Sequence, residues 1–179
     1  TEAQQVAEKL EDASQLFSIA QLARASDVHV AFNLSTKAVA KAIQWTNEVA
    51  DRARWLCDLA ISNKLTDLLV EKTGEIIRHK TVQFYIAKIL KDKEQYSASL
   101  SLCKICLKPY SQSESLKLVE PSILSTSSSP IQPQFDEGSI VPQELPRYLW
   151  ELSHEMVLLE SLNEKGMYDV LDYIIDQVD

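Results

Sequence analysis

The chain has 179 residues, 45% hydrophobic and 25% charged, a composition that suits one globular domain or a short stack of helical repeats. It has a formal net charge of −8 and only three glycines, and no apolar run approaches the ~18 residues needed to cross a bilayer. Scarce glycine argues against phosphate-binding loops and an all-β fold, because both need positive φ or close backbone approach. We therefore expect a helical protein without a membrane span.

The N-terminus lacks the basic-then-apolar layout of a secretory signal. The three cysteines, Cys57, Cys103 and Cys106, cannot form a disulfide framework in a chain of this size, which favours a reducing compartment. We expect an intracellular protein of the cytoplasm or nucleus. Because the chain opens and closes inside helical patterns, we also expect it to be a segment of a longer protein.

Residues 1–108 are predicted to form a first helical block. Apolar residues spaced by three and four predict a helix over 2–25, interrupted at Ser26-Asp27. Apolar residues alternate over 28–34, as in a short strand. A lone strand has nothing to pair with, so we favour a helical or irregular continuation.

Ser35 or Thr36 is predicted to cap a long helix that runs to about Ser62. Further helical segments are predicted at about 64–79 and in a helical hairpin over 80–107 that turns near 92–95. Gly74 weakens the interior of the first of these by roughly 1 kcal/mol relative to alanine.

The character of the chain changes at Pro109. From there on lie all six prolines, at positions 109, 121, 130, 133, 142 and 146. The run Ser125–Ser129 lies among them. Proline removes backbone donors and serine favours turns, so residues 109–143 are predicted to be a linker or long loop, with a short helix at about 113–119.

Residues 144–179 are predicted to form an acidic helical hairpin that packs on the first block. Its helices are expected at about 143–163 and 167–178, with a turn at 164–166. The predicted fold class is therefore all-α: antiparallel helical hairpins in a bundle or short α-solenoid, with a proline- and serine-rich insertion.

The segment 80–113 resembles one tetratricopeptide repeat of 34 residues. The positions that fit its pattern of large and small residues are Ile86, Ala87, Tyr96, Ser99, Cys103, Cys106 and Leu107. Leu90 replaces the usual tyrosine, the turn glycine is missing and the proline is displaced to Pro109. Gly166-Met167-Tyr168 is similar to a second turn of this kind, with Leu159 at the small position. The resemblance implies stacked helical hairpins that bind peptides or partner subunits.

Two motifs suggest metal chemistry. Cys103 and Cys106 have a thiolate-pair spacing, but no paired ligands complete a zinc set, so we interpret them as small core residues on one helix face. His154-Glu155 begins like a zinc-protease helix, yet Leu158 stands where the second histidine belongs. We predict no metal, no cofactor and no enzyme.

Charge divides the chain. Residues 136–179 hold 11 acidic and 2 basic residues, whereas residues 72–108 hold 8 basic and 3 acidic ones. This basic hairpin offers phosphate contacts at Lys80, Lys88, Lys91 and Lys93, with Tyr85 and Tyr96 for base stacking. An alternative is that it docks within the chain on the acidic C-terminal helices. The interpretation we favour is that these charges lie on solvated helix faces.

The leading hypothesis is a non-catalytic protein–protein interaction domain, a scaffold or subunit segment of a larger complex. Nucleic-acid binding through residues 72–108 is the alternative. Candidate partner-binding residues are Trp45, Trp55, Tyr148, Trp150, Glu151, Glu155, Asp169 and Asp172. Ser129-Pro130 is a minimal site for proline-directed phosphorylation.

Overall fold

A computed structural model of the chain describes residues 12–108 and 140–178, and these residues form eight α-helices and no strand. The helices are α2 (Ala13–Ala23), α3 (Val28–Ala40), α4 (Asn47–Ser62), α5 (Thr66–Ile76), α6 (Lys80–Asp92), α7 (Tyr96–Leu107), α9 (Leu145–Leu158) and α10 (Glu164–Val178). The predicted all-α class is confirmed. The predicted helix at 113–119, most of the predicted linker and residues 1–11 lie outside the described residues.

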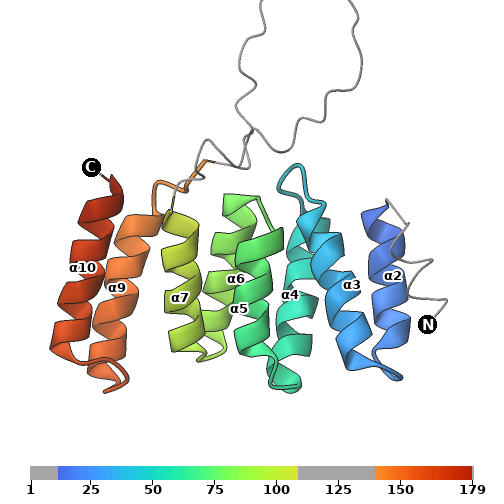
Figure 1. Cartoon of the computed structure of the whole chain (residues 1–179), viewed down its shortest axis with the longest axis horizontal. Coiled ribbons are helices and arrows are strands. Elements are labelled where there is room, and N and C mark those ends of the chain that lie inside the picture. Colours follow the sequence, from blue (N-terminus) through green and yellow to red (C-terminus); the bar gives the residue numbers. More distant parts are fainter. Residues whose placement is uncertain (1–11, 109–139, 179) are drawn as a thin grey trace, which may run out of the picture.

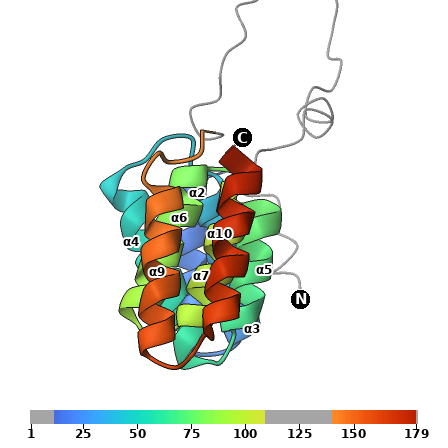
Figure 2. The ribbon, with the colours of Figure 1, turned by 90° about the vertical axis from the view of Figure 1, so that its left-hand side faces the viewer.

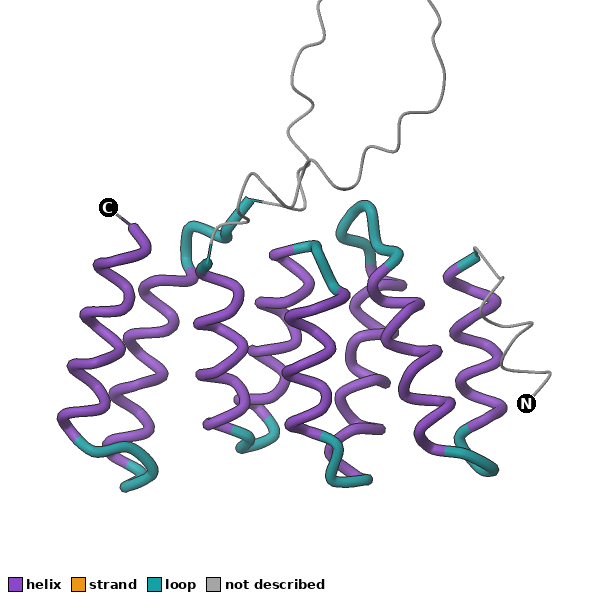
Figure 3. The backbone as a smooth tube through the Cα atoms, viewed as in Figure 1, coloured by secondary structure: helices purple, strands orange, loops and turns teal. Residues whose placement is uncertain are grey.

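The helices stand side by side in a row, from α2 at one end to α9 and α10 at the other (Figure 1). Consecutive helices pair as antiparallel hairpins: α2 with α3, α4 with α5, α6 with α7, and α9 with α10. Neighbouring hairpins pack through α4 on α6 and through α5 on both α3 and α7, while α9 packs on α7. Figure 3 shows that only short loops join the helices within each hairpin.

Local capping explains where α3 begins. The side chain of Asp27 accepts hydrogen bonds from the backbone N–H groups of His29 and Val30, at 3.0 and 3.1 Å. An aspartate in this position satisfies amides that have no partner inside the helix. The alternating residues after Asp27 therefore continue as a helix, as expected, and not as a strand.

The predicted cap at Ser35 or Thr36 is wrong. Both residues lie inside α3, where their buried hydroxyls donate to the Phe32 carbonyl oxygen at 3.0 and 2.8 Å. The predicted long helix is in fact two helices, separated by residues 41–46. Thr46 caps the second, because its hydroxyl accepts from Val49 N at 3.3 Å.

Three hairpin turns share one backbone arrangement. Lys64, Glu94 and Glu160 have positive φ values of 59°, 60° and 55°. The next residue in each turn donates its N–H to a carbonyl oxygen five residues earlier: Leu65 to Ala60, Gln95 to Leu90 and Ser161 to Met156. These bonds satisfy carbonyls at the helix end, as in a Schellman motif, at the cost of a left-handed non-glycine residue.

The turn predicted near 92–95 is confirmed, but the one predicted at 164–166 is wrong. The chain already turns around Glu160, and Gly166 lies in the first turn of α10. Asn163 explains this earlier start, because its side-chain oxygen accepts from Gly166 N at 2.7 Å. The Asn163 side chain thus accepts the hydrogen bond of the Gly166 amide at the start of the helix. Gly166 is therefore helical, although a turn was predicted there.

One large hydrophobic core runs through most of the row. The core contains buried residues from each of the helices α3 to α7. It also contains residues of the last hairpin, including Leu149, Met156 and Ile174. A small second cluster, formed by Leu16, Ala20, Leu34 and Ala38, holds α2 against α3. The helices on either side of residues 109–139 therefore bury their apolar faces together.

Candidate functional site

Trp55 is a packing residue between α2 and α4. Its ring meets Phe17 edge-on, with centroids 5.3 Å apart, and its half-buried side chain touches both hydrophobic clusters. Arg52, one turn earlier on α4, lies over the Phe17 ring, with Cζ 6.0 Å from its centroid. This indole therefore holds α2 in place.

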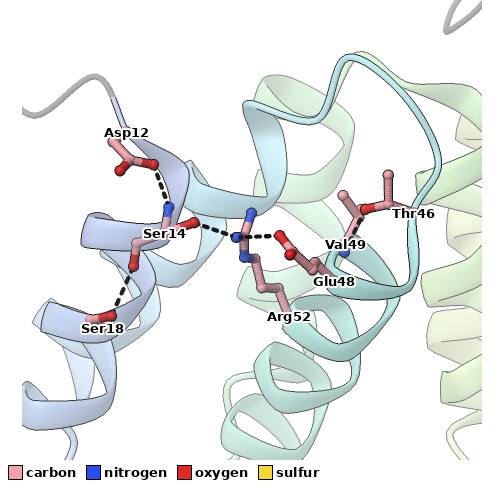
Figure 4. Close-up of polar contacts among 7 residues, drawn as sticks. All are labelled: Asp12, Ser14, Ser18, Thr46, Glu48, Val49 and Arg52. Atoms are coloured by element: carbon pink, nitrogen blue, oxygen red, sulfur yellow. Dashed lines mark hydrogen bonds and ion pairs between the residues drawn. The ribbon is translucent and has the colours of Figure 1, made fainter.

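Polar contacts reinforce the same junction (Figure 4). Arg52 Nη2 donates to Ser14 Oγ of α2 at 2.8 Å and lies 3.3 Å from Glu48 Oε2 on its own helix. Glu48 thus orients the guanidinium toward α2, and Asp12 caps α2 by accepting from Ser14 N at 2.9 Å.

Trp45 lies apart from Trp55, in the loop before α4. Its side chain is 40% exposed and packs edge-on against Tyr85 of α6, with centroids 4.6 Å apart. The guanidinium of Arg54 also lies over the Tyr85 ring, with Cζ 5.6 Å from the ring centroid. The two predicted partner-binding tryptophans therefore pack against different helices, and of the two only Trp45 presents a large exposed surface.

Lys80 does not contribute to a basic surface. Its side chain is only 1% exposed, and its Nζ donates to the carbonyl oxygens of Lys108 and Ile105 at 2.8 and 3.4 Å. Burial lowers the pKa of its ammonium group. The proposed phosphate contact at Lys80 is wrong, because α7 covers this side chain.

The other three lysines of that prediction are paired within the chain. Lys88 Nζ lies 2.7 Å from Glu144, at the start of α9, and Lys91 Nζ lies 2.6 Å from Glu155 of the same helix. The basic hairpin thus contacts the acidic C-terminal segment through these two lysines. Lys93 lies 3.0 Å from Asp58 of α4.

Aromatic contacts support the α6–α9 junction. Tyr148 meets Phe84 edge-on at 5.1 Å, and Lys88 Nζ lies 4.2 Å from the Phe84 centroid. Burial raises the pKa of the Tyr148 phenol. Farther along, the hydroxyl of Tyr173 on α10 donates to the Lys104 carbonyl oxygen of α7 at 2.6 Å. Tyr148 is thus part of an internal interface.

The cysteines lie in the core, which confirms the interpretation of Cys103 and Cys106 as core residues. All three thiols are free and buried, and burial raises their pKa values, that of Cys106 to about 12. Cys106 Sγ donates to the Lys80 carbonyl oxygen at 3.3 Å. Thiols held protonated in this way are poor metal ligands and poor nucleophiles.

The remaining predicted partner residues lie on the last hairpin. Glu151 pairs with Arg147 at 2.8 Å on α9, and Trp150 packs edge-on against His154 at 4.4 Å. Asp169 and Asp172 are exposed on α10, and neither forms an ion pair with another described residue. Among the predicted acidic side chains, Glu151 and Glu155 thus pair with basic residues, whereas Asp169 and Asp172 pair with none in the part of the chain that the structure describes.

Two further residues of α10 were missed as surface candidates. Tyr168 is 57% exposed and Ile175 47% exposed. For Ile175 the signal was the width of the apolar face of this helix: Met167, Val170, Leu171, Ile174, Ile175 and Val178 span more of the helix surface than one neighbouring helix covers. The candidate site is therefore the exposed face of α10, formed by Tyr168, Leu171 and Ile175 with Asp169, Asp172 and Asp176 (the α10 face).

Within residues 12–108 and 140–178, no three histidine, cysteine, aspartate or glutamate side chains gather as a metal ion would require. None of the helices described there combines the length and apolar character needed to cross a membrane. Ser129 lies outside the described residues. No family model, curated protein or solved structure is significantly similar to the chain.

Proposed function

We propose that this chain is a non-catalytic, intracellular protein-binding domain, a scaffold or subunit segment of a larger complex. The observation that carries the proposal is the α10 face, where exposed apolar side chains lie on one helix with aspartates that form no ion pair with any other described residue. Large apolar side chains on a helix surface mark contact sites when they gather and are rimmed by polar groups.

Repeated hairpin geometry supports a scaffold of stacked helical hairpins. Ser99 stands at the crossing of α6 and α7, where its hydroxyl donates to the Ala87 carbonyl oxygen at 2.7 Å. The turns at Lys64 and Glu94 are 30 residues apart and share their backbone hydrogen bonds. Stacked hairpins of this type provide extended surfaces for partner proteins.

The internal ion pairs weigh against nucleic-acid binding through residues 72–108. Lys88 and Lys91 already neutralise carboxylates of the last hairpin, and Lys80 is buried. Phosphate binding would have to displace these carboxylates, which reduces the electrostatic gain on which such binding depends.

The test is reconstitution of a stoichiometric complex. Proteins that co-purify with the tagged chain are identified by mass spectrometry, expressed, and mixed with the purified chain for size-exclusion chromatography with light scattering. We expect at least one protein to form a complex of fixed stoichiometry. A chain that elutes alone with every recovered protein would contradict the proposal, and RNA-dependent recovery would favour the nucleic-acid alternative.

A further inference from the structure

The inner side of α10 packs against the rest of the protein. Met167, Val170 and Ile174 are buried, and α10 contacts α9 along this side. Tyr173 adds the hydrogen bond to α7. With 3.6 residues per turn, these positions occupy one side of the helix and leave the other side for solvent.

An apolar line runs along the solvent side. Tyr168 and Ile175 are seven residues apart, which places them nearly one above the other after two turns. Leu171, between them, is half-buried at the inner edge of this line. An exposed apolar line of this spacing is what a helix presents to another helix.

An acidic line runs beside it. Asp172 and Asp176 are one turn apart, and Asp169 lies close to both on the helix surface. All three are exposed, and the ion pairs of the described residues include none of them. Residues 164–178 hold four acidic residues against the single Lys165, so the charge here is not compensated within the helix.

The α10 face also lies where nothing described covers it. Figure 2 looks along the row from the end at which α9 and α10 stand in front of the other helices. Helices within the row, such as α5 and α6, are covered from both directions by neighbouring hairpins. The last hairpin lacks such a neighbour among the described residues.

We infer that the α10 face binds an amphipathic helix of a partner protein whose apolar stripe is edged by lysine or arginine. The inference rests on the proposed protein-binding function and names its partner class. The 15 residues of α10 span about 22 Å, so a partner helix of four turns covers the whole line. Lysines along one edge of that helix meet the three aspartates, which steers docking and fixes its direction.

The negative charge of the α10 face favours a basic partner helix over a second copy of the chain and over an anionic membrane. A second copy of the chain, docked through the same face, would bring three further aspartates to an already acidic surface, and like charges repel. An anionic membrane surface would be repelled for the same reason. A basic helix gains both apolar burial and opposite charge.

The test uses a designed probe peptide of about 16 residues, with leucines at helical spacing and lysines along one edge. One control peptide carries glutamates in place of the lysines, and a second has the same leucines and lysines in scrambled order. We expect fluorescence anisotropy to show binding of the probe alone. Binding should weaken as salt rises, because exposed charges are screened.

Two variants of the full chain locate the site. Tyr168→Ser with Ile175→Ser, and separately Asp172→Asn with Asp176→Asn, should each weaken probe binding at least about tenfold. Leu22→Ser and Asp92→Asn, an exposed leucine on α2 and an exposed aspartate at the end of α6, should leave it unchanged. Circular dichroism verifies that all variants keep the wild-type Tm, as exposed positions allow.

Several results would overturn the inference: no binding of the probe, equal binding of the scrambled peptide, or binding unaffected by both α10 variants. Self-association of the chain that the α10 variants abolish would replace the partner helix with a second copy. A stoichiometric partner that binds the α10 variants as well as wild type would leave the proposed function standing and refute the α10 face alone.

Discussion

The Nζ of Lys80, at the start of α6, donates to the carbonyl oxygen of Lys108, just past the end of α7, over 2.8 Å. The same ammonium group reaches the Ile105 carbonyl oxygen at 3.4 Å. A positive charge at a helix C-terminus meets the negative end of the helix dipole and satisfies carbonyls that lack helical partners. A lysine expected on the surface is therefore a buried cap for α7.

Replacing Lys80 with methionine should destabilise the fold by about 1–3 kcal/mol, because the partly buried carbonyls lose their donor. Urea unfolding followed by circular dichroism measures the change, with the exposed Lys41→Met as the matched control. A Lys80→Met variant as stable as wild type would show that the cap contributes no net stability.

The lowered pKa of Lys80 predicts a pH dependence. Between the folded-state pKa and the ordinary value of 10.5, the unfolded chain binds more protons than the folded one, so this contribution to stability rises with pH. The difference in unfolding free energy between wild type and Lys80→Met should therefore increase in that window. A flat difference would contradict the shift.

Ser99 is predicted to be required as a small residue at the α6–α7 crossing. Its hydroxyl lies 2.7 Å from the Ala87 carbonyl oxygen, so a leucine at this position must push the helices apart. Ser99→Leu should lower the free energy of unfolding by about 1–3 kcal/mol. Ser101→Leu, two residues away on the exposed side of α7, should change it by less than about 0.5 kcal/mol.

Tyr173 is predicted to fasten α10 to α7 through its hydroxyl. Tyr173→Phe removes the 2.6 Å hydrogen bond to the Lys104 carbonyl oxygen and should cost about 0.5–1.5 kcal/mol in thermal or urea unfolding. Tyr168→Phe, on the exposed side of the same helix, is the control and should be neutral. Equal effects of the two changes would argue against a specific role for the Tyr173 bond.

The buried thiols should be unreactive in the folded protein. With pKa values raised above the ordinary 9.0, Cys57, Cys103 and Cys106 stay protonated at pH 8, so a thiol reagent should label them only after unfolding. Fast labelling of a native thiol would contradict this. Because the unfolded thiols lose protons that the folded ones keep, they should also contribute less to stability as pH rises above about 9.

The sequence alone was sufficient for the fold class and for most helices, because the 3.6-residue spacing of apolar residues is a local property. It also correctly assigned Cys103 and Cys106 to the core, since both fall on one helix face. The side-chain type of a residue was not sufficient to predict where a helix begins. Ser35 and Thr36 have the right side chains for a cap, but Thr46 is the residue that leaves the helical conformation.

Only the tertiary structure decided which charged and aromatic residues are available to a partner. The amino acids adjacent to Lys80 do not show that carbonyls 25 and 28 residues later cover it. Nor does local sequence show that Trp55 is enclosed by α2 while Tyr168 and Ile175 stay exposed at the end of the row. Periodicity fixes which side of a helix is apolar, whereas burial depends on how far the neighbouring helices extend over that side.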